Sequence, residues 1–340
     1  MSTTTKMHAA MVTGHGGPDC LEYAEVRIPD PTAGWARVRV LACALNMLDV
    51  FVRRGMPAVH LELPHIPGGD VAGVVDSLGE GVEGPVVGTP VLVDPLVGGK
   101  ALGEHLPGGL AEYVVVPAGN LIPLAVDRSE LPLYAALPIA YGTARRMLFE
   151  RARIQPGQTV VVLGAAGGVG VACVQLGSAA GAKIVACSSS AAKLARLEEL
   201  GATELIDTSV ADFSAEVWRL TGRQGADVVV DYLGRDTWAG SVRALRPGGR
   251  LVTCGASTGF LAETDLRYVW TRELEILGSD GWRREDLVAL VSQVRRGQLK
   301  PEIHGIFPLS DVRSAVSELE ERRAIGKVIV VPDEVASTAS

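Results

Sequence analysis

An uninterrupted apolar run at residues 160–163 is followed directly by a glycine-rich segment and then by a second stretch of small and apolar residues. Four apolar residues in a row predict a buried parallel strand, because such strands are covered on both faces. The stretch 171–180 predicts a helix that ends at Gly181, since glycine readily adopts the left-handed conformation that closes helices. A strand, a glycine turn and a helix in this order predict a dinucleotide-binding site, where the backbone approaches a pyrophosphate at the positive end of the helix.

The glycines of this segment are spaced as G-x-x-G-x-x-G rather than as G-x-G-x-x-G. A glycine pattern alone is weak evidence, but here a buried strand precedes it and a helix follows it. We therefore predict that this segment contacts a dinucleotide cofactor. The predicted contacts are Gly164, Gly167, Gly168, Val169 and Gly170.

From residue 159 to residue 254 the pattern alternates between strands and helices. Predicted strands lie at 159–163, 183–187, 204–206, 227–231 and 249–254, and predicted helices at 168–180, 191–200, 211–221 and 236–245. This alternation predicts an α/β fold with a doubly wound parallel sheet of the Rossmann type. Residues 274–278 predict one further strand at the edge of the sheet.

Residues 7–130 have a different pattern. Apolar and polar residues alternate from Trp35 to Ala42, and short apolar runs follow at 71–75, 90–93 and 113–116. Glycine and proline interrupt these runs at close intervals, which predicts a compact antiparallel β-barrel. Residues 131–150 are helix-like, with a break at Pro138.

Composition and charge narrow the range of functions. The 340-residue chain is 47% hydrophobic and 21% charged, and its net charge of −7 without a basic run makes nucleic acid an unsuitable partner. No apolar stretch approaches the roughly 20 residues of a membrane helix, and the N-terminus has no apolar signal core. The five cysteines are scattered without a CxxC pair, which favours reduced thiols in a cytoplasmic protein. The predicted partner is a small-molecule substrate.

The end of the second predicted strand indicates which nicotinamide cofactor is bound. An acid at this position binds the free ribose 2′-hydroxyl of NAD and repels a 2′-phosphate. Here the strand continues into Ser188 and Ser189, Lys193 follows, and there is no Asp or Glu from Gly164 to Leu197. Hydroxyls and an ammonium suit a phosphate, so we predict NADPH. In the alternative interpretation the serines only cap a helix and Lys193 is a solvated helix residue.

Six short segments occur in a characteristic order along nearly the whole chain. They are Asn46-Met-Leu-Asp49, Pro67-Gly-Gly-Asp70-Val-Ala-Gly73, Gly109-Leu-Ala-Glu-Tyr113, the glycine turn, Arg246-Pro-Gly-Gly-Arg250 and Gly326-Lys327. In this order they resemble the medium-chain dehydrogenase/reductase superfamily, and in particular its zinc-independent quinone oxidoreductase and enoyl reductase branch. The resemblance implies a GroES-like β-barrel catalytic domain at 1–130 and 285–340, a Rossmann NADPH-binding domain at 131–284, and a homodimer that pairs through 274–278. It also implies cofactor contacts at Thr143 and Lys327.

The resemblance also locates two metal sites that this chain has lost. Zinc alcohol dehydrogenases of the superfamily have a cysteine where Asn46 stands and a histidine–glutamate pair where Gly69 and Asp70 stand. Asn46 and Gly69 cannot replace those ligands. The segment 94–105, which would hold a structural zinc, contains no cysteine. We therefore predict no metal, and we interpret the nearby histidines as surface or packing residues; they are His60, His65 and His105.

Without a metal, hydrogen-bond donors must stabilise the charge that hydride transfer creates. Candidate donors are Asn46 and Tyr141, although Asn46 is also suited to a structural bond at a strand end and Tyr141 to core packing with its hydroxyl satisfied locally. Strand ends of a doubly wound sheet face the cofactor, which predicts nicotinamide contacts at Cys254, Gly255 and Ser279. No base near Cys254 is evident that would make it a nucleophile.

Three functions remain open at this point. The first is an NADPH-dependent reductase of quinones or α,β-unsaturated carbonyl compounds, whose products delocalise the new charge. The second is a zinc-free carbonyl or alcohol oxidoreductase. The third is an NADPH-binding protein with little turnover. The sequence does not identify the substrate, because pockets in this fold are formed by variable loops.

Overall fold

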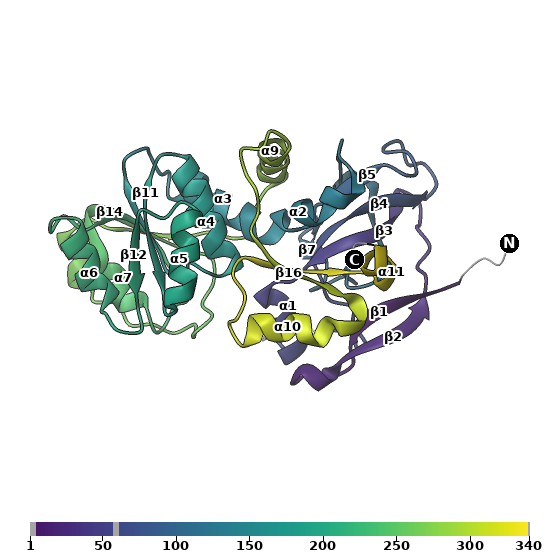
Figure 1. Cartoon of the computed structure of the whole chain (residues 1–340), viewed down its shortest axis with the longest axis horizontal. Coiled ribbons are helices and arrows are strands. Elements are labelled where there is room, and N and C mark those ends of the chain that lie inside the picture. The colour runs from purple at the N-terminus through teal and green to yellow at the C-terminus, as the bar shows by residue number, and fades with distance from the viewer. Residues whose placement is uncertain (1–4, 57–60, 339–340) are drawn as a thin grey trace. The chain divides into compact units, whose positions relative to one another are not determined.

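The computed structural model describes residues 5–56 and 61–338 and divides the chain into two compact units. The first unit contains the residues up to Ile139 together with those from Leu287 onward, and the second is Ala140–Asp286 (Figure 1). The predicted boundary at 130/131 is therefore nine residues too early. Helix α2 (Leu131–Ala135) buries Leu131, Tyr134 and Ala135 and packs against strands β3 and β4 of the first unit, which is why it belongs there.

The first unit is built on a seven-stranded sheet. Its strands have the order β16-β17-β3-β4-β5-β9, with β8 also paired to β3, and every pair except β16–β17 is antiparallel. The bounds are β3 Trp35–Ala44, β4 Asp70–Leu78, β5 Pro90–Val93, β8 Tyr113–Pro117, β9 Leu121–Pro123, β16 Ile303–Pro308 and β17 Lys327–Val331. Two-stranded sheets are formed by β1 (Lys6–Val12) with β2 (Leu21–Arg27) and by β6 (Leu96–Val97) with β7 (Lys100–Ala101).

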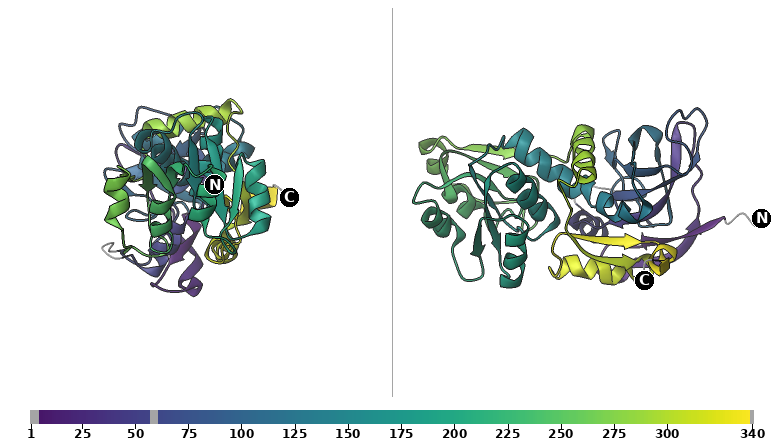
Figure 2. Two further views of the ribbon diagram at one scale, coloured as in Figure 1. Left: turned by 90° about the vertical axis from the view of Figure 1, so that its left-hand side faces the viewer. Right: turned by 45° about the horizontal axis from the view of Figure 1, so that its top comes forward.

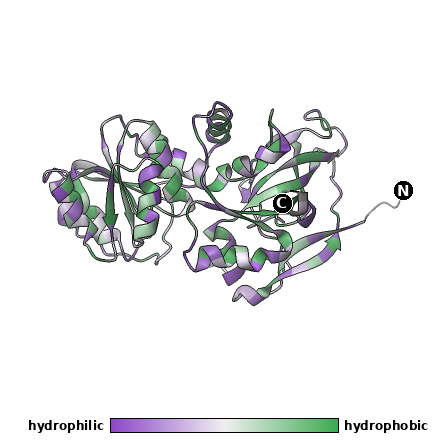
Figure 3. Ribbon diagram, in the orientation of Figure 1, coloured by the Kyte–Doolittle hydropathy of each residue, from purple (hydrophilic) through white to green (hydrophobic). Residues whose placement is uncertain are grey.

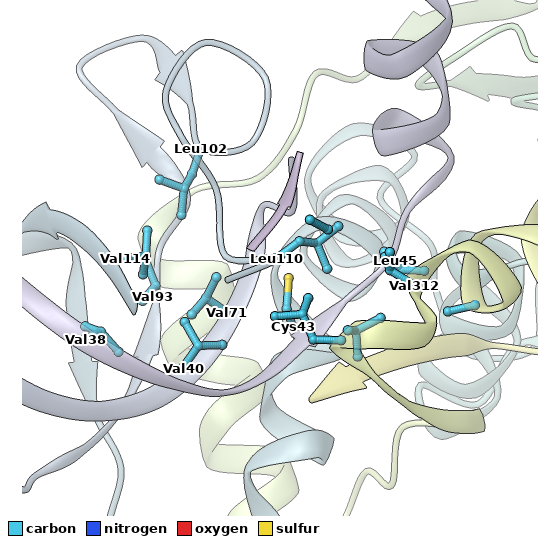
Figure 4. Close-up of a cluster of buried hydrophobic side chains, with 14 of the residues drawn as sticks. Val38, Val40, Cys43, Leu45, Val71, Val93, Leu102, Leu110, Val114 and Val312 are labelled. Carbon is cyan, nitrogen blue, oxygen red and sulfur yellow. The ribbon is translucent and has the colours of Figure 1, made fainter. Parts of the chain in front are cut away.

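Apolar side chains from several of these strands form one core. Val38, Val40 and Cys43 of β3 meet Val71 of β4 and Leu110 in the close-up view (Figure 4). This interior arises because alternate residues of a strand point to the same face of a sheet. The helices of the unit are α1 (Met47–Arg54), α2, α10 (Val312–Glu320) and α11 (Asp333–Thr338), and α9 (Arg284–Arg295) begins at the boundary between the units.

The second unit contains a six-stranded sheet in which every pair is parallel, in the order β12-β11-β10-β13-β14-β15. Counted from the first strand of the unit, this is the order 3-2-1-4-5-6 of the Rossmann fold. The strands are β10 Thr159–Val162, β11 Lys183–Ser188, β12 Glu204–Asp207, β13 Ala226–Val230, β14 Leu245–Thr253 and β15 Glu275–Gly278. The predicted doubly wound parallel sheet is confirmed.

Helices cover both faces of this sheet. Helices α4 (Gly168–Ala179) and α5 (Ala191–Glu199) lie on one face, and α6 (Phe213–Leu220) and α7 (Trp238–Ala244) on the other; a short α8 (Leu266–Thr271) precedes β15 (Figures 1 and 2). The strands between these layers are strongly hydrophobic (Figure 3). In the inner strands β10, β11 and β13 nearly all side chains are buried, on both faces of the sheet, as the uninterrupted apolar run at 160–163 predicts.

The helix-like stretch before β10 is irregular. Instead of one helix, the chain forms α2, a π-helical segment at Leu137–Gly142, the short α3 (Thr143–Arg145) and a second π-helical segment at Arg146–Arg151. Pro138 has no N–H to donate and so interrupts the regular helical hydrogen bonds, as expected. In the ranges 5–56 and 61–338, none of the helices has the length and apolar character needed to cross a bilayer.

Candidate functional site

The glycine turn connects β10 to α4 in the second unit. Gly164 has φ +60, a left-handed conformation that side chains disfavour. Gly170 lies in the first turn of α4, where a Cβ atom would be 2.5 Å from the Gly164 carbonyl oxygen, so only glycine allows this close approach. The first N–H groups of a helix have no hydrogen-bond partner within the helix. Helix α4 begins at Gly168, so these groups lie next to the tightly folded glycine turn. The predicted contacts at 164–170 are thus brought together in a turn suited to a pyrophosphate.

One residue that sequence reasoning missed lies against this turn. The hydroxyl of Tyr232 donates to the Gly164 carbonyl oxygen at 2.7 Å, and burial raises the pKa of this tyrosine well above its usual value. Tyr232 is the second residue after the apolar strand β13, which was the available signal, because residues just beyond the strand ends face the ligand in this fold. The preceding residue, Asp231, is fully buried and accepts bonds from the hydroxyls of Thr237 and Ser241.

The second strand in sequence order, β11, ends at Ser188, one residue beyond the predicted end at 187. The Ser188 side chain is largely buried and its Oγ accepts a bond from the backbone N–H of Ser190, whereas Ser189 is exposed and Lys193 is half-buried on α5. Ser190 is the residue before α5, and its side chain makes no capping bond. Strand β12 ends beside Ser188 at Asp207, whose carboxylate accepts bonds from Ser209; these bonds lower its pKa.

The carboxyl ends of β14 and β15 line an open cavity of about 480 Å³. Cys254, Gly255 and Ser279, the three predicted nicotinamide contacts, all line it. Burial raises the pKa of Cys254 to about 12. The thiol is therefore protonated at neutral pH, which argues against a nucleophilic role.

Tyr141 does not have the geometry of a substrate donor. It is fully buried, and its hydroxyl donates to Oε1 of Gln175 on α4 at 2.7 Å. Because that hydroxyl has only one proton, this arrangement fits the core-packing alternative and does not support donation to a substrate. Thr143, two residues further on, is also buried, at the start of α3.

In the first unit, Asn46, Asp70 and Lys327 form a buried network. The Lys327 ammonium donates to Asn46 Oδ1 at 2.5 Å, to the Leu45 carbonyl oxygen at 2.8 Å and to Asp70 Oδ2 at 3.0 Å. Lys327 is 2% exposed and Asp70 is 0% exposed. The Asn46 amide in turn donates to Asp70 Oδ2 at 2.9 Å and to the Ala44 carbonyl oxygen at 3.4 Å.

This network changes two site predictions. All three ammonium protons of Lys327 have acceptors within the first unit, so this geometry leaves none directed to a cofactor and does not support the predicted cofactor contact. Both amide protons of Asn46 are directed to protein oxygens, so it is not a free donor to substrate, and the structural alternative fits. Asp49 completes the arrangement by accepting bonds from the backbone N–H groups of Asn46 at 2.8 Å and Gly68 at 2.9 Å.

Asp49 has an unusual proton affinity. Burial, opposed by its hydrogen bonds and by Lys327, raises its pKa from 3.8 to about 6. The folded protein therefore holds this proton more tightly than the unfolded chain does. The stabilisation that results is fully present below about pH 4 and is lost as the pH rises through about 6.

We expect this dependence to be measurable with Asp49→Asn. A rise in pKa from 3.8 to about 6 corresponds to roughly 3 kcal/mol. Between pH 7 and pH 4, the unfolding free energy of the natural protein should therefore rise relative to that of the variant by an amount of this order. Urea unfolding across this range provides the measurement. A difference that does not change with pH would show that Asp49 titrates normally.

The residues at the metal positions do not fit zinc. Asn46 and Gly69 are not zinc ligands, and the remaining carboxylate, Asp70, already holds an ammonium, whose charge would repel a metal ion. Within the described ranges there is no cluster of three or more His, Cys, Asp or Glu residues arranged to hold a metal. His65 is buried beside the Gly103 carbonyl oxygen, His105 accepts from the Ala101 N–H, and His60 lies outside the described residues. The absence of metal stays a prediction.

Comparison with known proteins identifies the family. Residues 32–126 match the family described as "Alcohol dehydrogenase GroES-like domain", and residues 168–296 match "Zinc-binding dehydrogenase". The human "Synaptic vesicle membrane protein VAT-1 homolog" is 33% identical, over 96% of this chain and 86% of its own length. The chain belongs to the medium-chain dehydrogenase/reductase superfamily. The "Quinone oxidoreductase" of Rattus norvegicus is 29% identical over 97% of this chain and 100% of its own length.

A further relative and a solved structure agree with this assignment. The "2-haloacrylate reductase" of a Burkholderia species is 29% identical over 95% of this chain and 98% of its own length. The structure of an "NAD-dependent alcohol dehydrogenase" has a TM-score of 0.90 and 38% identity, covering 96% of this chain and 99% of that one. The chain is thus an oxidoreductase of this superfamily, in the quinone oxidoreductase and enoyl reductase-like branch. It has a GroES-like domain and a Rossmann domain, and its family binds a nicotinamide cofactor.

Proposed function

We propose that this protein is an NADPH-dependent reductase that transfers hydride, without zinc, to a quinone or to an α,β-unsaturated carbonyl compound. The observation that carries the proposal is the Asn46–Asp70–Lys327 network, in which side chains at the metal positions bind an ammonium. Its residues do not provide the ligands that a zinc ion, acting as a Lewis acid, would need. The acceptor itself must then delocalise the negative charge that hydride creates, as an enone does in its enolate and a quinone in its hydroquinone anion.

The second unit provides for the cofactor. The close approach of Gly170 to Gly164 leaves room for a pyrophosphate at the start of α4, and Ser188, Ser189 and Lys193 are proposed to receive the 2′-phosphate. When bound, NADPH supplies the hydride. Cys254, Gly255 and Ser279 orient its reactive end, and the buried thiol of Cys254 stays protonated and takes no covalent part. Neither Asn46 nor Tyr141 is proposed as a proton or hydrogen-bond donor to the substrate.

Two relatives support the substrate class, since their names denote a quinone oxidoreductase and a reductase of a haloacrylate. A haloacrylate contains a carbon–carbon double bond conjugated to a carboxylate. One comparison favours a second candidate, a zinc-free alcohol or carbonyl oxidoreductase, because a structure at 38% identity is titled an alcohol dehydrogenase.

The deciding experiment is turnover of NADPH with a panel of quinones, enones, enoyl thioesters and simple ketones. We expect activated double bonds or quinones to be reduced much faster than unactivated ketones. Faster turnover of simple ketones would reject the proposal and favour the second candidate. NADPH binding without reduction of any acceptor would indicate a binding protein. The same assay in a chelator should show undiminished rates.

The cofactor preference can be tested at Lys193. Lys193→Ala should weaken NADPH binding by about 1–2 kcal/mol, the scale of a charge-assisted hydrogen bond, and should leave NADH binding nearly unchanged. Fluorescence titration of both cofactors against both proteins measures this. If both cofactors weaken equally, Lys193 does not bind the phosphate and the alternative of a solvated helix residue holds.

We propose further that the protein is a cytoplasmic homodimer. Strand β15 has only one partner, β14, in the sheet as described, and its Ile276 side chain is 42% exposed. An unpaired apolar strand edge favours association, which a closed two-fold dimer satisfies without aggregation.

A further inference from the structure

The cavity at the ends of β14 and β15 contains two arginines that no predicted cofactor contact includes. Arg146 and Arg151, both from the π-helical segment before β10, line it together with Cys254 and Ser279. In the described parts of the chain, no hydrogen bond or ion pair reaches the Arg146 guanidinium, and its Nε is buried without a partner. A buried N–H without an acceptor costs free energy, so an acceptor supplied by a bound ligand would stabilise the site.

The other polar groups of the cavity strengthen this assignment. Ser279 Oγ is also buried without a partner. Arg151 uses its Nε for the Gly278 carbonyl oxygen at 2.7 Å, and Thr253 donates its hydroxyl to the Gly255 carbonyl oxygen at 2.9 Å. Asp280, which is exposed, is the only carboxylate among the lining residues. Two guanidinium groups against one carboxylate leave the cavity with one net positive charge.

We propose that Arg146 forms an oxyanion-binding subsite in this cavity, and that its ligand is the carboxylate of a small acidic substrate. The guanidinium offers parallel N–H donors that match the two oxygens of a carboxylate, and the Ser279 hydroxyl is a further donor in the same cavity. The inference deepens the proposed function, on which it rests, because it selects unsaturated acids from among the activated alkenes. The Arg146 side chain binds and orients the acid; it takes no part in bond making.

Binding can be tested without turnover. Isothermal titration of the full-length protein with acrylate and with acrylamide compares an anion with a neutral molecule of nearly the same shape, in the presence and absence of saturating NADP⁺. We expect acrylate to bind at least about tenfold more tightly, and Arg146→Met to abolish this preference. Arg146→Lys, which keeps the positive charge but lacks the parallel N–H donors of a guanidinium, should retain part of the preference for acrylate. Arg267→Met, which removes an exposed arginine paired with Asp265 and outside the cavity, should retain all of it.

Several outcomes would overturn the subsite. One is equal binding of acrylate and acrylamide, and another is an undiminished preference for acrylate in Arg146→Met. A third is loss of acrylate binding when NADP⁺ is present, which would mean that the cofactor fills the cavity. Inorganic phosphate, titrated in parallel, would overturn the carboxylate assignment if it bound more tightly than acrylate. Because these measurements record binding, they succeed or fail independently of the reductase assays.

Discussion

Lys327→Met is expected to lower the free energy of unfolding by roughly 3–5 kcal/mol, the scale for removing one partner of a buried ion pair. Methionine fills a similar volume but has no charge, so the carboxylate of Asp70, which is 0% exposed, would lose its ammonium partner. Its remaining neighbours are the Asn46 amide and the backbone N–H of Ile139. Urea unfolding of the variant beside the natural protein gives the number directly.

The double variant Lys327→Met/Asp70→Asn separates charge from packing. It removes both charges and keeps an amide that can still bond to Ile139, so we expect it to recover much of the lost stability. A matched control is Lys6→Met, because Lys6 also pairs with a carboxylate, that of Glu25, but at an exposed position, where an ion pair contributes little. If Lys327→Met cost no more than the Lys6 control, the network would not be a stabilising element.

The network also shows where sequence reasoning stopped. Its residues occur in three segments that the family resemblance had already identified, yet Asp70 and Lys327 are separated by 257 positions. Hydrophobic periodicity describes local elements and carries no information about which polar ends of distant strands meet. The interpretation of Lys327 as a cofactor contact came from its segment alone, and the three acceptors around its ammonium could only be found in the fold.

The Rossmann unit was predictable because its signals are local. A strand that is buried on both faces needs an apolar run. The turn needs glycine at 164 because the backbone there is left-handed, and at 170 because the helix approaches the turn closely. Tyr141 was not predictable in the same way. Its ring suits either a pocket or a core, and only the position of Gln175 one helix away decides that its hydroxyl is already satisfied.

The first domain boundary was misplaced for a related reason. The change from strand-rich to helix-like sequence occurs near residue 131, and this pattern predicts the boundary there. However, a helix belongs to the unit against which its apolar face packs, and α2 packs on β3 and β4. The change of pattern marks a change of secondary structure, and only the packing partners locate the domain limit.

Gly170→Ala is expected to weaken NADPH binding by about 1–3 kcal/mol, which is roughly 5- to 150-fold, and to lower stability by a similar amount. The new Cβ would lie 2.5 Å from the Gly164 carbonyl oxygen and 2.7 Å from backbone atoms of Ala165. Both neighbours are backbone, so the turn must open to admit the methyl group. Alanine normally favours a helix over glycine by up to about 1 kcal/mol, and that gain is too small to offset the clash.

Two further glycine variants distinguish the fold of the turn from its contact with the cofactor. At Gly167 the backbone is extended and a Cβ would lie 3.5 Å from its nearest neighbours, so Gly167→Ala should leave the unfolding free energy within about 0.5 kcal/mol. It should still weaken NADPH binding, because its methyl group would occupy the space proposed for the pyrophosphate. Gly84→Ala, with nothing within 4 Å, should change neither property. If Gly167→Ala bound NADPH as tightly as the natural protein, the pyrophosphate would not approach the turn at this residue, and the effect of Gly170→Ala would have to be assigned to altered folding alone.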